Sequence, residues 1–269
     1  MDPLSHGWFV TFAIVLAAMV LRSTLVIGAA FAWIRSTSFA ERRRIYRFAY
    51  AKGQLGSELK AALLVVAFDA LLFSSTRYFG LIDYAPAPSW GVAIYTYLIL
   101  FVWIEIWFYV THRAMHHPAL YRIHRQHHVA KVTDPLTSLS FSLGERAVLL
   151  VGVFAFAILV SKLTPLSFGA LIAVGLTNYV FNVLGHSNVE FVPEWIARSA
   201  PGRLIITPSF HAMHHARYKG HYGLYTTILD RWFGTAFDDY EAVYDRARSG
   251  AGLSRPGERV KPAEVAARA

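Results

Sequence analysis

The chain contains no cysteine, which excludes disulfide bonds, zinc–thiolate sites and iron–sulfur clusters. Charged residues are also scarce, because Asp, Glu, Lys and Arg make up 16% of the sequence, where a soluble domain carries about 25%. Hydrophobic residues make up 55%, and the mean hydropathy is +0.38. These figures exclude an ordinary soluble domain and indicate an integral membrane protein.

Asp and Glu are fewer than Lys and Arg, and this excess of basic residues gives the chain a net charge of +9. In a soluble domain such an excess suggests nucleic acid as the partner. Here the basic residues flank long apolar runs, so we expect no nucleic acid. Their expected partner is the anionic cytoplasmic lipid surface.

Five apolar runs are long enough to cross a bilayer, which requires about 20 residues in a helix. They cover residues 8–33, 59–81, 91–111, 147–163 and 166–185. The predicted fold is therefore all-α and polytopic, with about five transmembrane helices arranged as an N-terminal span and a four-helix core. We expect one membrane-embedded domain over residues 1–243 and a disordered tail over residues 244–269.

Basic residues gather in the segment between the first two runs: Arg35, Arg42, Arg43, Arg44, Arg47 and Lys52. The positive-inside rule places this segment in the cytoplasm and the N-terminus outside. Following the alternation, residues 112–146 and 186–243 form a cytoplasmic helical cap. We expect the protein to be a multi-pass membrane protein whose histidines all lie on the cytoplasmic side.

Eleven of the twelve histidines lie between His112 and His221, and nine form three clusters. The clusters are His112, His116 and His117; His124, His127 and His128; and His211, His214 and His215. Residues three and four apart share a helix face, so the members of each cluster can point the same way. Pro118 ends a helix after the first cluster, the second cluster begins the next, and Pro208, with Thr207 as its N-cap, opens the helix of the third. A cluster of this kind predicts a metal site.

Imidazole suits iron, zinc, copper and nickel, so the ligand type does not choose the metal. Eight or more histidines exceed the needs of one ion, and two metals are the simpler interpretation. Two other classes stay open. One is a haem-binding membrane electron carrier, and the other is a metal transporter or membrane zinc hydrolase.

The order of the histidine motifs, with Pro135 to Phe141 between them and Asp230 to Thr235 after them, resembles the fatty acid hydroxylase/sterol desaturase superfamily over residues 90–237. The resemblance implies a non-haem di-iron centre that uses O2 and external electrons to hydroxylate or desaturate a lipid, as a monooxygenase of lipid metabolism. The lipid can be a sterol, a fatty acyl chain or a related isoprenoid or hydrocarbon. No catalytic residue is expected beyond the metal centre, and zinc can replace iron in purified protein.

Carried over by position, the resemblance implies these metal ligands: His112, His116, His117, His124, His127, His128, His186, His211, His214 and His215. Of His116 and His117, either can be the ligand. Some members have a further histidine where this chain has Asn182, and many have Asn where it has His221. We expect His221 to support a ligand rather than to bind metal.

Electrons must come from a separate partner, for which the resemblance implies a b-type cytochrome or a ferredoxin with its reductase. Basic residues near the histidines could dock its acidic face: Arg122, Arg125, Arg217 and Lys219.

Carboxylates that accept the outer N–H of a ligating histidine tune such a site. The candidates are Asp134, Glu145, Glu190 and Asp230. Glu105, inside the third run, can play the same part or bond a neighbouring helix. Arg22 and Asp69 lie near the middle of the first two runs, and we expect them to form an ion pair.

Overall fold

A computed structural model describes residues 7–261 of the chain, and within this range the regular elements are all helical. Five helices are long: α1 (Trp8–Ser36), α3 (Gln54–Tyr78), α4 (Trp90–Met115), α6 (Leu143–Ser161) and α7 (Phe168–Gly185). The short α-helices are α2 (Ser38–Arg42), α5 (Tyr121–His124), α8 (Glu194–Ala197), α9 (Pro208–Arg217), α10 (Ile228–Trp232) and α11 (Tyr240–Arg248). Three 3₁₀ turns complete them: η2 (His127–Val129), η3 (Pro135–Leu139) and η4 (Gly202–Leu204).

The five long helices confirm the predicted spans, since each is long and apolar enough to cross a membrane. Large apolar side chains such as Phe9, Leu63, Trp90 and Leu159 are more than half exposed on them. In water this surface would be strongly unfavourable, whereas in a bilayer it contacts lipid tails. The chain is a multi-pass membrane protein.

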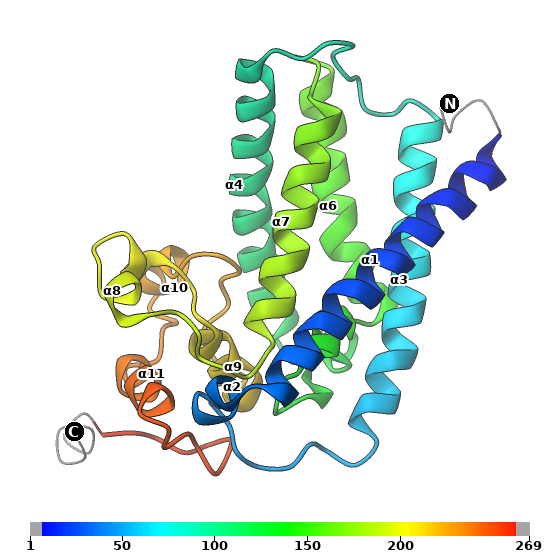
Figure 1. Ribbon diagram of the computed structural model, residues 1–269. Coiled ribbons are helices and arrows are strands. Elements are labelled where there is room, and N and C mark those ends of the chain that lie inside the picture. The colour runs from blue at the N-terminus through cyan, green and yellow to red at the C-terminus, as the bar shows by residue number, and fades with distance from the viewer. Residues whose placement is uncertain (1–6, 262–269) are drawn as a thin grey trace.

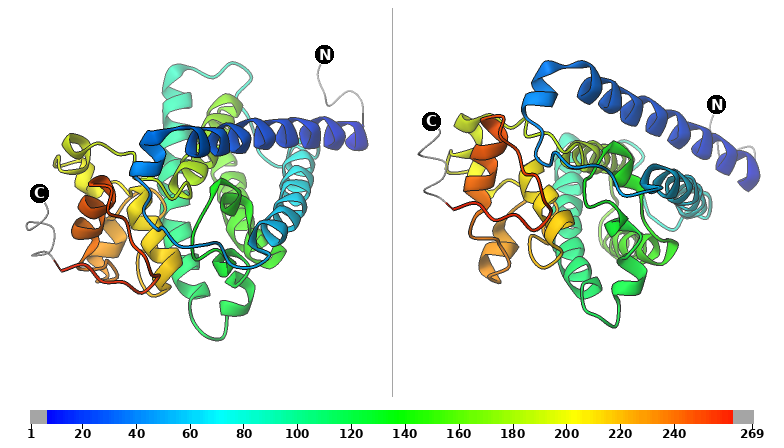
Figure 2. Two further views of the ribbon diagram at one scale, coloured as in Figure 1. Left: turned by 60° about the horizontal axis from the view of Figure 1, so that its bottom comes forward. Right: turned by 90° about the horizontal axis from the view of Figure 1, so that it is seen from below.

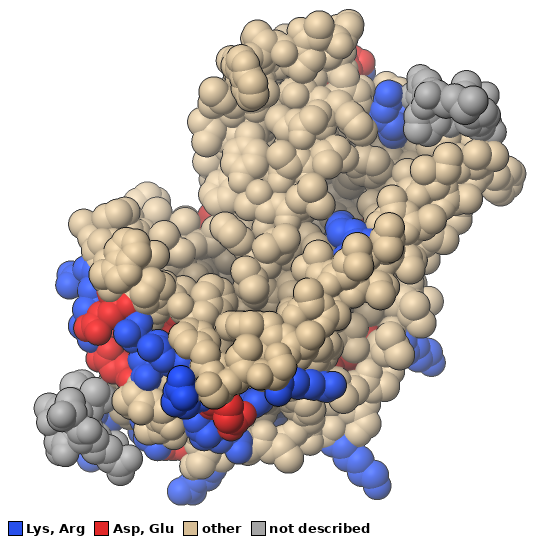
Figure 3. Space-filling model, in the orientation of Figure 1, with Lys and Arg blue, Asp and Glu red and all other residues tan. Residues whose placement is uncertain are grey.

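The long helices α4, α6 and α7 stand side by side, and α1 packs along α3 and crosses α7 (Figure 1). The short helices α8 to α11 gather beside the lower end of this bundle (Figure 1), and both further views show them together on one side of it (Figure 2). On the face shown in Figure 3, charged side chains gather over the same lower part. The molecule therefore has an apolar membrane region and one polar cap region.

The histidines of the first and third clusters lie at helix ends in the cap region. Helix α4 ends at Met115, one turn after it presents His112 and three residues before Pro118. Helix α9 begins at Pro208, and the side chain of Thr207 accepts the N–H of Phe210 as the predicted N-cap. The second cluster does not begin a long helix as expected, because α5 ends at His124 and the chain passes into η2 at His127.

The expectation of a disordered tail is wrong for the described residues beyond Tyr244. Residues up to Arg248 continue helix α11, and Leu253 and Val260 are buried in a cluster with Ile45 and Met213. Apolar residues spaced widely among Gly, Pro and Arg give no periodic signal, yet Leu253 and Val260 pack into the same buried cluster. Residues 262–269 of the predicted tail lie outside the described range.

The predicted ion pair between Arg22 and Asp69 is wrong. Asp69 instead makes a two-bond ion pair with Arg146, at 2.7 Å from Nε and 2.6 Å from an outer nitrogen. The fourth apolar run of the sequence begins at Ala147 and so excludes Arg146, whereas the helix begins one turn earlier, at Leu143. Arg22 stacks over the ring of Tyr179, with 4.0 Å between its guanidinium carbon and the ring centre.

Candidate metal centre

The structure gathers nine of the ten predicted ligands into two groups. His112, His116, His124, His128 and His214 form group A, and His127, His186, His211 and His215 form group B. In each group, the nitrogen atoms that could bind a metal lie within 4.8 Å of one another, and eight of the nine residues are buried. The tenth predicted ligand, His117, is exposed and belongs to neither group.

Helical spacing explains how the groups form. Residues four apart share a helix face, so His112 with His116 and His211 with His215 enter the same group. Neighbouring residues point about 100° apart, and the doublet His214–His215 is therefore divided between the groups. The doublet His127–His128 is divided likewise. The expectation that each cluster faces one point is corrected: each doublet contributes to two adjoining points.

Most of the gathered histidine rings donate a hydrogen bond from Nδ1, the nitrogen that faces away from the group. His112, His214, His215 and His186 donate this N–H to the backbone carbonyls of Tyr222, Gly220, Ala130 and Asn182, at 2.7–3.0 Å. His124 donates to the carboxylate of Glu145 at 2.7 Å. These bonds fix the tautomer and turn Nε2 towards the centre of each group.

The tautomers leave lone pairs facing one another. A neutral imidazole carries one N–H, and His186 and His215 both spend theirs on a carbonyl. Their Nε2 atoms nevertheless lie 3.2 Å apart, where neither can donate to the other. In group A, Nε2 of His112 is buried and has no hydrogen-bond partner. Bare nitrogens packed in this way fit a positive ion between them.

Protons do not supply that positive charge. Burial lowers the pKa of His116 to about 3 and that of His186 to about 4. Burial, reinforced by the neighbouring imidazoles, also lowers the pKa values of His127, His128, His211, His214 and His215 well below their ordinary value. The rings are therefore neutral at physiological pH, which is the form that binds metals.

The spacing of the nitrogens also fits a metal. Closest Nε2 pairs lie 3.1–3.2 Å apart in group A and 2.9–3.4 Å apart in group B. Ligands about 2.1 Å from one ion are separated by about 3.0–3.4 Å in octahedral or tetrahedral geometry. The residues present therefore fit two metal ions bound side by side.

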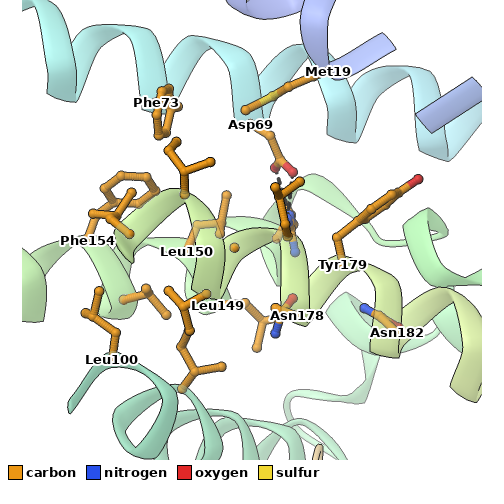
Figure 4. A pocket seen from close by; sticks show the side chains of 18 of the residues that line it. Met19, Asp69, Phe73, Leu100, Leu149, Leu150, Phe154, Asn178, Tyr179 and Asn182 are labelled. Carbon is orange, nitrogen blue, oxygen red and sulfur yellow. Dashed lines mark hydrogen bonds and ion pairs between the residues drawn. The ribbon is translucent and has the colours of Figure 1, made fainter. Parts of the chain in front are cut away.

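A cavity of about 470 Å³ adjoins the two groups, lined by residues of all five long helices (Figure 4). Three of its lining residues touch the histidines. Phe141 stacks on His127 at 4.6 Å between ring centres, Phe108 lies 4.8 Å from His112, and the carbonyl of Asn182 accepts from His186. Most of the lining is aliphatic or aromatic, so the cavity suits a hydrocarbon chain.

Of the predicted supporting carboxylates, Glu145 alone bonds a gathered histidine directly. Asp230 accepts the backbone N–H groups of Tyr222 and Gly223, and Glu190 accepts that of Ser209 at the start of α9. Glu105 accepts those of Tyr225 and Thr226. These three hold the segments that carry the ligands and their carbonyl partners.

Asp134 lies further away, where it caps the 3₁₀ turn η3 by accepting the N–H of Leu136.

His221 is buried outside both groups. Its Nδ1 donates to the carbonyl of Phe210, and its Nε2 accepts the N–H of Phe237 at 2.8 Å. Both ring nitrogens are thus used to join α9 to the segment after α10. Its φ of 58° lies in the left-handed region that Asn and His tolerate better than most residues, which explains their exchange at this position.

Sequence reasoning missed the carbonyl partners of the rings, since every residue has a carbonyl and no side-chain pattern marks them. It also missed Phe108 and Phe141, which read as ordinary membrane and loop aromatics.

Comparison with known proteins gives a consistent picture. The sequence model named "Fatty acid hydroxylase" matches residues 97–235. The chain is 32% identical over 195 residues to the "Very-long-chain aldehyde decarbonylase GL1-4" of Oryza sativa, which is 69% of this chain and 30% of that protein. It is 30% identical over 148 residues to the "Very-long-chain aldehyde decarbonylase CER1" of Arabidopsis thaliana, covering 53% and 23%. The chain thus spans less than a third of the length of these relatives. No solved structure matches it.

Proposed function

The chain belongs to the fatty acid hydroxylase family, and from this premise we propose that it oxidises a C–H bond of a long aliphatic lipid with O2, using two iron ions held by the histidine groups. A hydroxylation of this class consumes one O2, two electrons and two protons, and yields one alcohol and one water. A desaturation takes the same inputs and yields an alkene and two waters.

One observation carries the proposal: two adjoining groups of neutral imidazoles meet the end of an apolar cavity within the membrane helices. A zinc hydrolase needs neither a second all-histidine group nor a membrane cavity of this size. A haem carrier places single histidines on facing spans, and here the gathered histidines lie at helix ends and in the cap region.

Iron ions bound in groups A and B supply the ability to activate O2 for attack on an unactivated C–H bond. The protein's own residues prepare the site. The carbonyl partners and Glu145 hold the rings in one tautomer, and Phe108 and Phe141 keep water from the cavity side of the rings. The cavity holds a hydrocarbon chain without removing it from the bilayer.

The relatives' names make very-long-chain aldehydes the first substrates to test, followed by fatty acyl lipids. The lining of the cavity is mostly aliphatic and aromatic, so it suits the hydrocarbon chain of either lipid.

A separate electron donor completes the proposal, and it docks on the cytoplasmic side of the cap region. Arg122, Arg125 and Lys219 are exposed and available to an acidic partner. Arg217 is removed from the predicted docking set, because its side chain is 3% exposed and pairs with Asp239 at 2.6 Å.

Adjacent histidines give the sharpest test. In purified, iron-loaded protein, His214→Ala removes a ligand of group A and His215→Ala a ligand of group B. We expect iron content to fall from two ions per chain to about one in each variant and to near zero in the double variant, with loss of reductant- and lipid-dependent O2 consumption. The adjacent residues His116 and His117 supply the control, since His117→Ala should keep both ions while His116→Ala should not.

Full O2 consumption by the double variant, or equal iron loss in His117→Ala, would contradict the proposal. A Soret band in the purified protein would support the haem carrier instead, and oxygen-independent hydrolysis of a lipid would support the zinc hydrolase.

A further inference from the structure

The cavity is polar at the end nearest the histidines and apolar at the other. Along α7, Tyr179 and Asn182 lie seven and four residues before His186, or about 10 and 6 Å of helix rise. Leu171, at the far end of the same wall, lies about 22 Å before it. Figure 4 shows the same division, with Phe73, Phe154 and Leu100 at one end and Tyr179 and Asn182 at the other.

Arg22 lines this cavity from α1 and has no carboxylate partner among residues 7–261. Its Nε is buried without a hydrogen-bond partner, and its one polar contact is a long 3.4 Å bond to the hydroxyl of Ser23. The nearby Asp69 cannot neutralise it, because both oxygens of Asp69 bond Arg146. An uncompensated arginine within a membrane span is costly and marks a functional site.

The position of Arg22 relates this charge to the histidines. Its guanidinium lies 4.0 Å from the ring centre of Tyr179, on the α7 wall near the polar end. The charges lining the cavity, Arg22, Asp69 and Arg146, sum to one positive charge. A ligand that complements these residues carries an oxygen atom that accepts a hydrogen bond and bears a full or partial negative charge.

We propose that Arg22 binds the terminal carboxylate or carbonyl oxygen of a single-chain lipid. The substrate then lies with its oxygenated head near the histidines and its tail along the apolar end of the cavity. The carbon presented to the metal centre is consequently close to the head rather than at the far end of the chain. This inference rests on the proposed function only for the statement about which carbon is oxidised.

Helix α1 lies outside residues 97–235, the part of the chain that the family model matches. The family's shared region therefore supplies the histidines, whereas α1 supplies Arg22. The proposed selection of the head group therefore depends on a helix outside the region that the family model matches.

Binding to the full-length, metal-loaded protein in detergent tests the proposal without turnover. Radiolabelled stearate is the probe, and unlabelled octadecanal and octadecane compete. We expect Arg22→Met to weaken stearate binding at least tenfold and to leave competition by octadecane unchanged. The control is Arg35→Met on the same helix, which does not line the cavity and should bind stearate normally.

A second variant separates the two head groups. Arg22→Gln keeps N–H donors but removes the charge, so a carboxylate-specific site loses stearate and retains octadecanal. A site for carbonyl oxygens keeps both ligands within a few-fold. Because Gln is polar, this variant removes the charge without placing an apolar side chain at the polar end of the cavity.

Unchanged binding of stearate and octadecanal in Arg22→Met would overturn the proposal, as would an equal loss for octadecane, which shows a packing role. In turnover, oxidation at carbons near the head is expected, and a product oxidised at the far end of the chain overturns the orientation. Stearate binding that depends on Arg22 in a protein that consumes no O2 refutes the proposed function and leaves this inference standing.

Discussion

At the scale of single residues, the histidine doublets are the feature on which the centre depends. Two neighbouring imidazoles cannot serve one ion from a helix, because their side chains diverge by about 100°. In this protein the divergence is used: His127 and His215 meet in one group while His128 and His214 meet in the other. Two shared helical segments therefore fix the two groups close together, as a pair of cooperating metals requires.

Glu145 permits a prediction about metal affinity. Its carboxylate accepts Nδ1–H of His124 at 2.7 Å, and both side chains are 1% exposed. Replacing it in Glu145→Gln weakens the acceptor and the basicity of the ring, so we expect metal affinity to fall about 10- to 100-fold. Titration with a competing chelator measures this. The exposed Glu241→Gln is the control, and an affinity equal to that of the control contradicts the role of Glu145.

His221 permits a prediction about pH and stability. Burial lowers its pKa from 6.5 to about 3 in the folded protein. The unfolded chain therefore binds a proton that the folded chain refuses, so the stability contribution is complete above about pH 6.5 and declines as pH falls towards 3. In His221→Gln we expect a lower melting temperature at pH 8 and a shallower fall between pH 8 and 5.

Thermal unfolding of the two proteins in detergent at several pH values measures the difference. Parallel curves for wild type and His221→Gln would show that His221 is not a source of the acid sensitivity.

At the scale of elements, the membrane helices are joined by an ion pair rather than by apolar packing alone. Arg146 on α6 donates two hydrogen bonds to the carboxylate of Asp69 on α3 beside the cavity. Removing one partner of such a pair destabilises the protein, because the other charge is left alone in a low-dielectric region. Replacing both partners by apolar residues of similar size changes the stability little. The pair therefore fixes how α3 sits against α6 more than it adds stability.

Substituting both members of this pair tests whether they interact directly. Asp69→Asn and Arg146→Met are each expected to destabilise the protein by about 3 kcal/mol or more, and the combined variant is expected to be more stable than either. Melting temperatures in detergent measure the cycle. Exchanging the charges, with Asp69→Arg and Arg146→Asp together, should restore folding, whereas the exchange of Arg22 and Asp69 should not. Additive losses in the double variant contradict a direct pair.

At the scale of the whole molecule, five spans place the two ends of the described chain on opposite sides of the membrane. The structure puts the segment between α3 and α4 at one end of the bundle and the cap region at the other (Figure 1). The basic residues of the first loop predict that the cap region is cytoplasmic. This sidedness decides which compartment supplies electrons.

The absence of cysteine makes the sidedness testable, because any introduced thiol is the only one. Ala87→Cys, in the exposed segment between α3 and α4, should react with a membrane-impermeant maleimide in intact cells. Lys131→Cys, in the exposed part of the cap region, should react only after the membrane is opened. The reverse pattern would place the histidines outside and exclude a cytoplasmic electron donor.

The sequence by itself determined the spans, the helix ends near Pro118 and Pro208, and nine of the histidines that the structure gathers. These follow from local rules: apolar length, proline geometry and the three- and four-residue spacing of helices. The sequence also indicated Glu145 as a supporting carboxylate, because few carboxylates lie near the histidine clusters in the sequence.

Only the tertiary structure decided which partners meet across the chain. It divided the doublets between two groups, excluded His117, joined Asp69 to Arg146 instead of Arg22, and ordered the segment after Tyr244 against Ile45. Each of these outcomes depends on how distant helices rotate about their axes, and no local pattern encodes that rotation. The pairing of Asp69 with Arg146, which leaves Arg22 without a carboxylate among the described residues, has the same origin.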